Sequence, residues 1–216
     1  MTYQPKVKIC GVTLADDAAH VAASGADYIG LNFWPKSKRY VAPERGSLLA
    51  SVARTRGAIQ VVGVFVDASV AEVADVSSRV DLDIIQLHGD ESPEAVAAIA
   101  AATGRPIWKS VAIHGPGSID HLEAWSVDVL LLDTPSAGKG GSGTTFDWTL
   151  AADARRRYGS IKFALAGGLD PANVGAAIDA VQPWAVDVAS GVEAGPGVKD
   201  AAQVAAFVAA VRGRAR

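Results

Sequence analysis

The chain has one cysteine, Cys10, which closes the first apolar run of the sequence and is followed by Gly11. A thiol at the end of a strand faces a loop where a ligand can reach it, and a neighbouring glycine lets backbone and ligand come close. A lone cysteine forms no disulfide within its chain, so it is either a small buried hydrophobe or a reactive group. The residues at the other predicted strand ends distinguish these two roles.

A lysine and an aspartate are the expected neighbours of this thiol. Lys8 lies two residues before Cys10, so both side chains point to the same side of the strand, about 7 Å apart. A lysine inside a barrel requires a partner, and Asp187 on the last predicted strand is the candidate. The hypothesis is that the Lys8 charge lowers the Cys10 pKa and raises its thiolate fraction.

Asp133 is the candidate acid, because it follows the apolar residues 129–132. Partial burial there would raise its pKa and keep it protonated, as a general acid requires. The alternative is an aspartate that serves a turn or a helix cap. Cys10 and Asp133 would face each other across the mouth of the fold, an arrangement suited to proton removal and delivery.

Apolar runs typical of strands alternate with alanine-rich stretches of helical spacing along the chain. The predicted strands are 7–10, 28–33, 59–66, 84–87, 107–111, 129–132, 161–166 and 185–188. The predicted helices are 16–24, 43–56, 70–80, 93–102, 118–126, 148–158, 171–181 and 200–211. Helix starts are expected at Ser92-Pro93 and Asp170-Pro171, and left-handed helix ends at Gly25, Gly104 and Gly159. Eight alternating units predict an α/β fold, a single (β/α)₈ TIM barrel domain over residues 1–216.

Composition excludes several other classes of protein. Half of the 216 residues are hydrophobic and a fifth are charged, as in a globular core, and the net charge of −3 gives no reason to expect a nucleic-acid partner. No signal-peptide pattern is present, and the apolar run at 96–102 is too short to cross a membrane. One cysteine without a signal is typical of a cytoplasmic protein.

The carboxyl ends of the strands carry the polar residues, and in a TIM barrel that rim forms the active site. The candidates there are Cys10, Arg39, Gln86, His88, Asp133, Gly141, Ser142, Gly143, Gly167, Gly168, Asp187, Ser190 and Gly191. Because the opposite strand ends carry no comparable set, an enzyme is favoured. The glycines after the sixth, seventh and eighth strands indicate a phosphate site, although a single glycine pair is more often a turn.

Arg39 and His88 are the candidate side chains for substrate binding. The arginine fork matches a carboxylate in shape and charge, although a surface arginine in a basic loop is the competing interpretation. His88, at the end of the fourth strand, is a plausible hydrogen-bond donor to the substrate. No His, Asp and Glu set has metal-ligand spacing, so no metal is expected.

These residues together resemble the phosphoribosylanthranilate isomerase family of tryptophan biosynthesis. The matching segments are Lys8-Ile-Cys-Gly11, Pro35-Lys-Ser-Lys-Arg-Tyr40, Gln86-Leu-His-Gly89, Leu131-Leu-Asp-Thr134, Gly140-Gly-Ser-Gly-Thr-Thr-Phe-Asp-Trp148, Ala166-Gly-Gly-Leu169 and Val186-Asp-Val-Ala-Ser-Gly-Val-Glu193. The cysteine motif together with the Pro-Lys-Ser-Lys-Arg loop is the most specific part. Trp34 stands where the family commonly has tyrosine, and Ala166 where serine is common, which removes one candidate phosphate contact.

The resemblance implies an isomerase that carries out an Amadori rearrangement without a cofactor. Its substrate would be N-(5′-phosphoribosyl)anthranilate, and its product 1-(2-carboxyphenylamino)-1-deoxyribulose 5-phosphate. By this resemblance Asp133 protonates the ring oxygen, Cys10 removes the C2′ proton, and Arg39 holds the anthranilate carboxylate. By the same resemblance the glycines after the seventh and eighth strands hold the phosphate. The expected partner is this phosphorylated small molecule, with no membrane or nucleic acid, and the chain is expected to be a monomer or homodimer.

Two other functions remain open at this point. The first is another phosphosugar enzyme, such as an epimerase or the histidine-pathway isomerase, which resembles a pattern with aspartate at the end of the first strand. Cys10 argues against that isomerase. The second is a non-catalytic barrel that binds a phosphometabolite, which would have no need for both Cys10 and Asp133.

Overall fold

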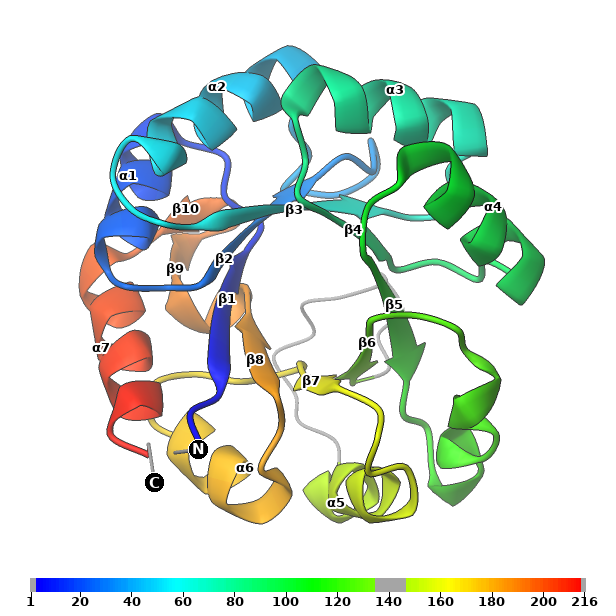
Figure 1. Ribbon diagram of the computed structural model, residues 1–216. Helices are drawn as coiled ribbons and strands as arrows, with labels where there is room; N and C mark the ends of the chain where they lie inside the picture. Colours follow the sequence, from blue (N-terminus) through cyan, green and yellow to red (C-terminus); the bar gives the residue numbers. More distant parts are fainter. Residues whose placement is uncertain (1–2, 135–146, 215–216) are drawn as a thin grey trace.

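The computed structural model describes residues 3–134 and 147–214, and its eight parallel strands close into a barrel in the order β1 to β8 (Figure 1). The strands are β1 Lys6–Cys10, β2 Tyr28–Asn32, β3 Gln60–Phe65, β4 Ile84–Leu87, β5 Ile107–Ala112, β6 Val129–Asp133, β7 Phe163–Leu165 and β8 Ala185–Val188. The predicted α/β barrel is therefore confirmed. All eight predicted strands are present, and β4 and β8 match the predicted bounds at both ends.

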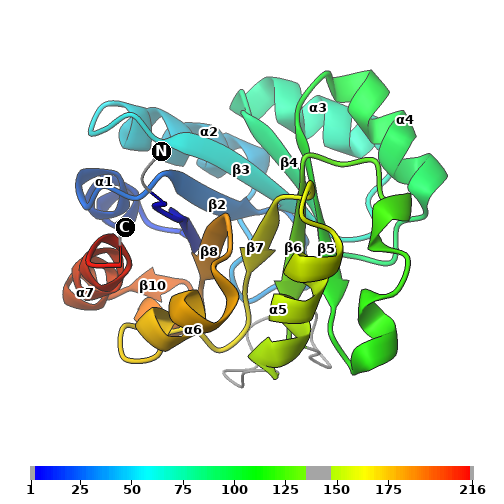
Figure 2. The ribbon, with the colours of Figure 1, turned by 60° about the horizontal axis from the view of Figure 1, so that its bottom comes forward.

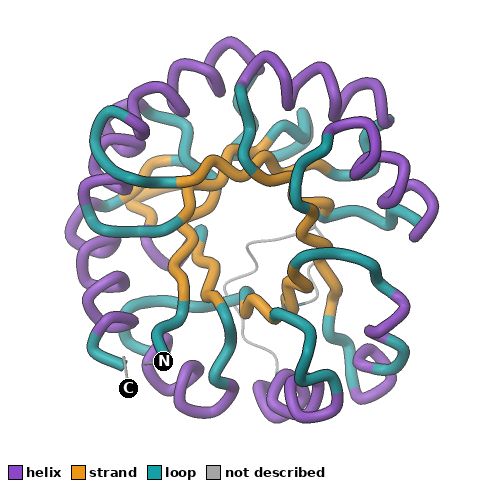
Figure 3. The backbone as a smooth tube through the Cα atoms, in the orientation of Figure 1, coloured by secondary structure: helices purple, strands orange, loops and turns teal. Residues whose placement is uncertain are grey.

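Helices surround the barrel, as the backbone tube in Figure 3 shows. The described residues contain seven α-helices: α1 Ala15–Ala23, α2 Pro43–Arg54, α3 Val70–Val80, α4 Pro93–Thr103, α5 Trp148–Arg157, α6 Val174–Val181 and α7 Ala201–Arg212. The first and last helices, α1 and α7, lie side by side on the outside of the barrel (Figure 2).

The predicted helix at 118–126 is wrong. The connection between β5 and β6 contains two short 3₁₀ turns instead, η1 Pro116–Ile119 and η2 Leu122–Ala124. His121 between them has a φ of 60°, a left-handed conformation that cannot continue a right-handed helix. The spacing of apolar residues there reflects two buried side chains, Ile119 and Leu122, one in each turn.

The predicted helix boundaries are confirmed in part. Ser92 caps α4 by accepting a hydrogen bond from Ala95 N, and Gly25 and Gly104 are left-handed with φ of 84° and 61°. Gly159 is not left-handed, because α5 already ends at Tyr158 in a φ of −124°. The helix expected from 171 begins later, at Val174.

Apart from the buried Lys8, the barrel interior is apolar toward the amino ends of the strands and polar at their carboxyl ends. The apolar side chains inside the barrel form one cluster, which reaches the cavity at Ala166 and consists of Tyr28, Val62, Ile84, Trp108, Val129, Leu131, Ala164, Ala166 and Ala185. Within it, the rings of Tyr28 and Trp108 meet edge to face with centroids 5.1 Å apart. Because alternate residues of a strand point inward, Cys10, Gln86, Asp133 and Asp187 continue these inward positions toward the rim. The polar side chains inside the barrel are therefore concentrated at the carboxyl ends of the strands.

After β8 the chain forms a 3₁₀ turn, η3 Ser190–Val192, and then a small antiparallel ribbon beside the barrel mouth. The two strands of the ribbon are β9 Glu193–Gly195 and β10 Val198–Lys199. This ribbon brings Glu193 and Lys199 to the rim, where they meet the loop after β2.

Candidate active site

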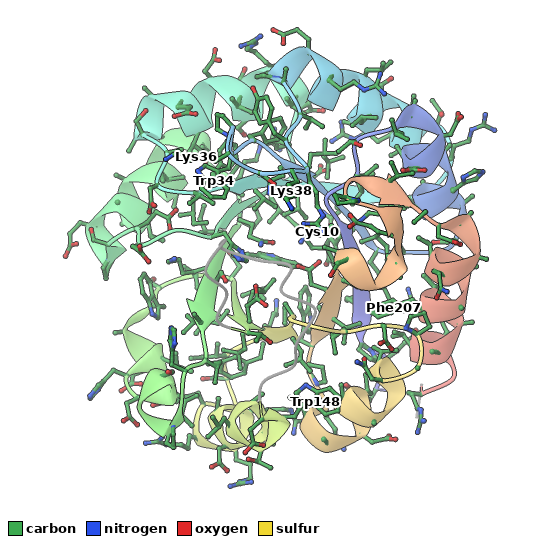
Figure 4. All side chains as sticks on the ribbon, turned by 180° about the vertical axis from the view of Figure 1, so that it is seen from behind. Cys10, Trp34, Lys36, Lys38, Trp148 and Phe207 are labelled. Atoms are coloured by element: carbon green, nitrogen blue, oxygen red, sulfur yellow. The ribbon has the colours of Figure 1, made fainter. Side chains whose placement is uncertain are left out.

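A cavity of about 740 Å³ opens at the carboxyl ends of the strands. Its wall includes nine of the candidate residues: Cys10, Arg39, Gln86, His88, Asp133, Gly167, Gly168, Asp187 and Ser190. Gly191 does not line it, and Gly141, Ser142 and Gly143 lie outside the described residues. Figure 4 shows Cys10 near the middle of the molecule, with Lys38, Trp34 and Lys36 of the loop after β2 toward one side. Nine of the thirteen candidate residues therefore line one cavity.

Cys10 is half-buried at the end of β1, opposite Gly30 of β2. A Cβ atom on Gly30 would lie 2.7 Å from the Cys10 Sγ atom, so the glycine makes room for the thiol. An isolated glycine within a strand indicates such a close approach. That signal was present in the sequence, but the candidate list did not include Gly30.

The expected ion pair beneath Cys10 is confirmed. Lys8 is fully buried, and its Nζ atom lies 2.8 Å from Asp187 Oδ2. The Asp187 carboxylate raises the pKa of Lys8 above its usual value, although burial acts in the opposite direction. The second Asp187 oxygen, Oδ1, is buried without a hydrogen-bond partner among the described residues. It therefore remains an acceptor for a ligand.

Lys8 lowers the pKa of Cys10, as expected, but the net shift of the Cys10 pKa is upward. Burial raises the pKa of the Cys10 thiol; Lys8 lowers it, and Asp187 raises it again. The sum is a pKa above the ordinary cysteine value. At neutral pH the free protein therefore holds Cys10 mainly as the thiol, and the thiolate is a minor but strongly basic form.

Asp133 is buried at the end of β6 and takes part in a chain of three side chains. Its Oδ1 accepts a hydrogen bond from Thr134 N at 2.8 Å, a local contact of the kind that a turn aspartate makes. Its Oδ2 lies 3.2 Å from His88 Nε2, and His88 Nδ1 lies 3.0 Å from Gln86 Nε2. Because the Gln86 amide nitrogen can only donate, Nδ1 accepts, and the ring hydrogen sits on Nε2 toward Asp133.

His88 faces protein partners at both ring nitrogens, Gln86 at Nδ1 and Asp133 at Nε2, and it also lines the cavity. Its predicted contact with the substrate stays a prediction. Gln86 Oε1, by contrast, is buried without a hydrogen-bond partner in the described part of the chain. Gln86 lines the cavity, and this oxygen is an acceptor that a hydroxyl group of a ligand can satisfy.

Arg39 reaches the cavity across Gly11, but two of its donors are already used. Its Nε and Nη2 atoms donate to the two Glu193 carboxylate oxygens, each at 2.7 Å. Glu193 also accepts from Lys199 Nζ at 2.8 Å. A Cβ atom on Gly11 would lie 2.2 Å from Arg39 Cδ, so only glycine allows this path. In the described part of the chain, the remaining Arg39 donors stay available to an anion.

Hydrogen bonds and opposite charges set the ionisation of this group. The hydrogen bond from Arg39 and the charge of Lys199 hold the pKa of Glu193 below its usual value, although burial opposes them. Burial lowers the pKa of Lys199 even beside Glu193. The role of Glu193 and Lys199 was not foreseen, since their partner Arg39 is 154 residues away from Glu193.

The glycine pair after β7 adopts left-handed conformations. Gly167 and Gly168 have φ of 85° and 63°, and a Cβ atom on Gly167 would lie 2.1 Å from Thr134 Oγ1. A Cβ atom on Gly191 would lie 2.0 Å from Leu169 O, so the loops after β7 and β8 pack directly on each other. The two loops thus form one backbone-rich corner of the rim, at which Ser190 and both β7 glycines line the cavity.

Within the described ranges 3–134 and 147–214, no group of three or more His, Cys, Asp or Glu side chains is placed to hold a metal ion. In the same ranges, no helix is both long and apolar enough to cross a membrane.

Comparison with known proteins gives one consistent family. Residues 7–210 match the family model described as N-(5′-phosphoribosyl)anthranilate (PRA) isomerase. The N-(5′-phosphoribosyl)anthranilate isomerase of Ralstonia nicotianae is 42% identical, covering 97% of this chain and 94% of its own length.

Solved structures agree with the sequence comparison. The phosphoribosyl anthranilate isomerase of Thermotoga maritima superposes with a TM-score of 0.89 at 40% identity, covering 97% of this chain and 99% of its own. A phosphoribosyl anthranilate isomerase in complex with reduced 1-(o-carboxyphenylamino)-1-deoxyribulose 5-phosphate gives a TM-score of 0.85 at 38% identity, with 97% and 99% coverage. The chain belongs to the N-(5′-phosphoribosyl)anthranilate isomerase family.

Proposed function

We propose that this cavity converts N-(5′-phosphoribosyl)anthranilate into 1-(2-carboxyphenylamino)-1-deoxyribulose 5-phosphate, with Cys10 as general base and Asp133 as general acid. The observation that carries the proposal is that a thiol from β1 and a buried carboxyl from β6 line the same cavity. A non-catalytic binding barrel would need neither. Membership in this family supports the reaction. The rearrangement needs one acid and one base and no redox group, which Asp133 and Cys10 can supply.

The two anionic groups of the substrate bind at separate parts of the rim. The anthranilate carboxylate takes the Arg39 donors that Glu193 leaves free, and the fork geometry of the guanidinium suits it. The phosphate lies at the corner formed by Gly167, Gly168 and Ser190, where left-handed glycines can present backbone N–H groups. Holding both ends places the ribose over the barrel mouth.

Ring opening is the first chemical step. The Asp133 carboxyl proton passes to the furanose ring oxygen, the C1′–O bond breaks, and the nitrogen lone pair forms the C1′=N bond of a Schiff base. The carboxylate that remains accepts a hydrogen bond from Thr134 N, and its second oxygen faces His88 Nε2 at 3.2 Å. These two donors stabilise the negative charge that the step creates.

Proton removal from C2′ is the second step. The Cys10 thiolate takes the C2′ proton, and the C–H electrons form the C1′=C2′ bond while the C1′=N electrons return to nitrogen. The resulting enolamine loses its hydroxyl proton and gains one at C1′, which gives the ketone. The buried Lys8 cation favours the thiolate, and the raised pKa of Cys10 makes that thiolate a strong base.

The test follows the loss of phosphoribosylanthranilate fluorescence with the wild type, Cys10→Ala and Asp133→Asn. Each substitution is expected to lower kcat by about 10²- to 10⁴-fold, the usual contribution of a general acid or base. Arg79→Gln, at an exposed ion pair of α3, is the matched control and should leave turnover unchanged. Undiminished turnover in both site variants would overturn the mechanism, and an inactive wild type would overturn the function.

A further inference from the structure

A buried ion pair lies beside the active site without lining the cavity. Lys109 of β5 and Glu91 of the loop after β4 are each 3% exposed, and Lys109 Nζ lies 2.9 Å from Glu91 Oε2. Lys109 pairs in register with Leu87, so it points out of the barrel, away from the inward Gln86. Burying two charges is weakly stabilising at best, so the pair has to be explained by what else it holds.

The ion pair forms hydrogen bonds with both main-chain polar groups of Gly89, its N–H and its carbonyl. Its N–H donates to both Glu91 carboxylate oxygens at 3.1 Å, and its carbonyl accepts from Lys109 Nζ at 2.7 Å. Glu91 Oε1 also accepts from Asp67 N at 2.9 Å, which ties the loop after β3 to the loop after β4. A Cβ atom on Gly89 would lie 2.6 Å from Asp67 N, so the two loops leave no space to shift.

Gly89 directly follows His88, whose own N–H donates to Phe65 O at 2.8 Å. The main chain of His88 is therefore fixed on both sides. The His88 ring lies between Gln86 and Asp133, with Nδ1 3.0 Å from Gln86 Nε2 and Nε2 3.2 Å from Asp133 Oδ2. A rotation of the peptide group between His88 and Gly89 would change both distances. The ion pair and Asp133 are thus joined through two consecutive residues, Gly89 and His88.

We propose that Glu91 and Lys109 are positioning residues that fix Gly89 and thereby aim the His88 Nε2 hydrogen at Asp133. They move no proton and touch no substrate. The proposal rests on the proposed function only for its effect on turnover, because the orientation of His88 can be measured without the reaction. A displacement of about 1 Å at such a residue can lower turnover by about 10²-fold.

The variant that isolates this role is Lys109→Met combined with Glu91→Gln. Methionine keeps the apolar length of the lysine and removes the donor to Gly89 O, while glutamine keeps an acceptor for Gly89 N and leaves no unpaired buried charge. Neutral replacements of buried ion pairs commonly fold. We expect kcat to fall about 10- to 100-fold, with KM within about 2-fold of wild type.

A second readout does not depend on the reaction. Nitrogen NMR of the imidazole rings reports which nitrogen carries the hydrogen, and the chain has only four histidines, so a His88→Asn spectrum identifies His88. We expect the wild type to show the Nε2-protonated form and the double variant to show a mixture. The Arg79→Gln control should match the wild type in both readouts. In an Asp133→Asn background, the double variant should lower kcat no further.

Wild-type kcat and an unchanged His88 tautomer in the folded double variant would overturn the proposal. An equal loss of kcat in the Asp133→Asn background would overturn it as well, because the pair would then act independently of Asp133. If the wild type does not turn over the substrate, the proposed function fails while the NMR comparison still decides the positioning role. Should the double variant not fold, Glu91→Asp, which shortens the reach to Gly89 and keeps the charge, is measured in the same way.

Discussion

Replacing Lys8 with methionine removes a buried cation from beneath the Cys10 thiol. The two residues are alternate positions on one face of β1, with Cα atoms about 7 Å apart, and because the two side chains lie closer than this, that distance gives a lower bound on their interaction. With an effective dielectric constant of about 20, two unit charges at that distance interact by about 2 kcal/mol. That energy corresponds to about 30-fold in the fraction of Cys10 that is thiolate. The Asp187 carboxylate, left without its partner, acts in the same direction.

The assay is the ultraviolet absorbance of the thiolate against pH. Cys10 is the only cysteine, so subtracting the titration of Cys10→Ala, which keeps the same four tyrosines, isolates the thiolate signal. The Lys8→Met titration should move to higher pH, and turnover should fall by a smaller factor, because a thiolate of higher pKa is a stronger base. Lys6→Met is the matched control, since Lys6 is on the same strand but its partner is Asp27 at the exposed end. An unshifted titration in a folded Lys8→Met protein would refute the reasoning.

Three further substitutions test separate parts of the structure. The new methyl group of Gly30→Ala would meet Cys10 Sγ, so this variant should lower kcat by about 10-fold or more. The control is Gly159→Ala, where a methyl group has space, and it should keep the wild-type kcat. Equal kcat values in the two variants would contradict the close packing of Gly30 on Cys10. Arg39→Lys should raise KM for phosphoribosylanthranilate by about 30-fold with little change in kcat, because lysine lacks the fork; an unchanged KM would place the carboxylate elsewhere. Asp27→Asn should destabilise the fold by about 2 kcal/mol at pH 7 in urea unfolding. Hydrogen bonds hold the pKa of Asp27 below its usual value, so this difference should shrink as the pH falls below about 4, and a pH-independent difference would contradict it.

Features that follow from periodicity along the chain could be predicted from the sequence. The barrel followed from eight alternating units, and the Lys8–Asp187 pair followed from strand parity and the need of a buried lysine for a partner. The helix at 118–126 failed because apolar spacing does not reveal a left-handed residue such as His121.

Features that depend on contacts between distant loops could not be predicted. Glu193 meets Arg39 only because the ribbon after β8 folds over the loop after β2. The hydrogen bonds from Gly89 to Glu91 and from Lys109 to Gly89 likewise depend on how the loop after β4 packs against β5. The net pKa of Cys10 was missed because it is a balance between burial and nearby charges, and strand order alone does not give the extent of burial.

The most direct test of Cys10 as the base is turnover, by Cys10→Ala, of substrate that carries deuterium at C2′. If the thiolate removes this proton, kcat falls by about 10²- to 10⁴-fold, and C2′–H cleavage becomes the slowest step. The residual reaction then runs clearly slower with deuterium than with hydrogen. A Cys10→Ala protein that keeps wild-type turnover, with equal rates for the two isotopes, would show that another group takes the proton.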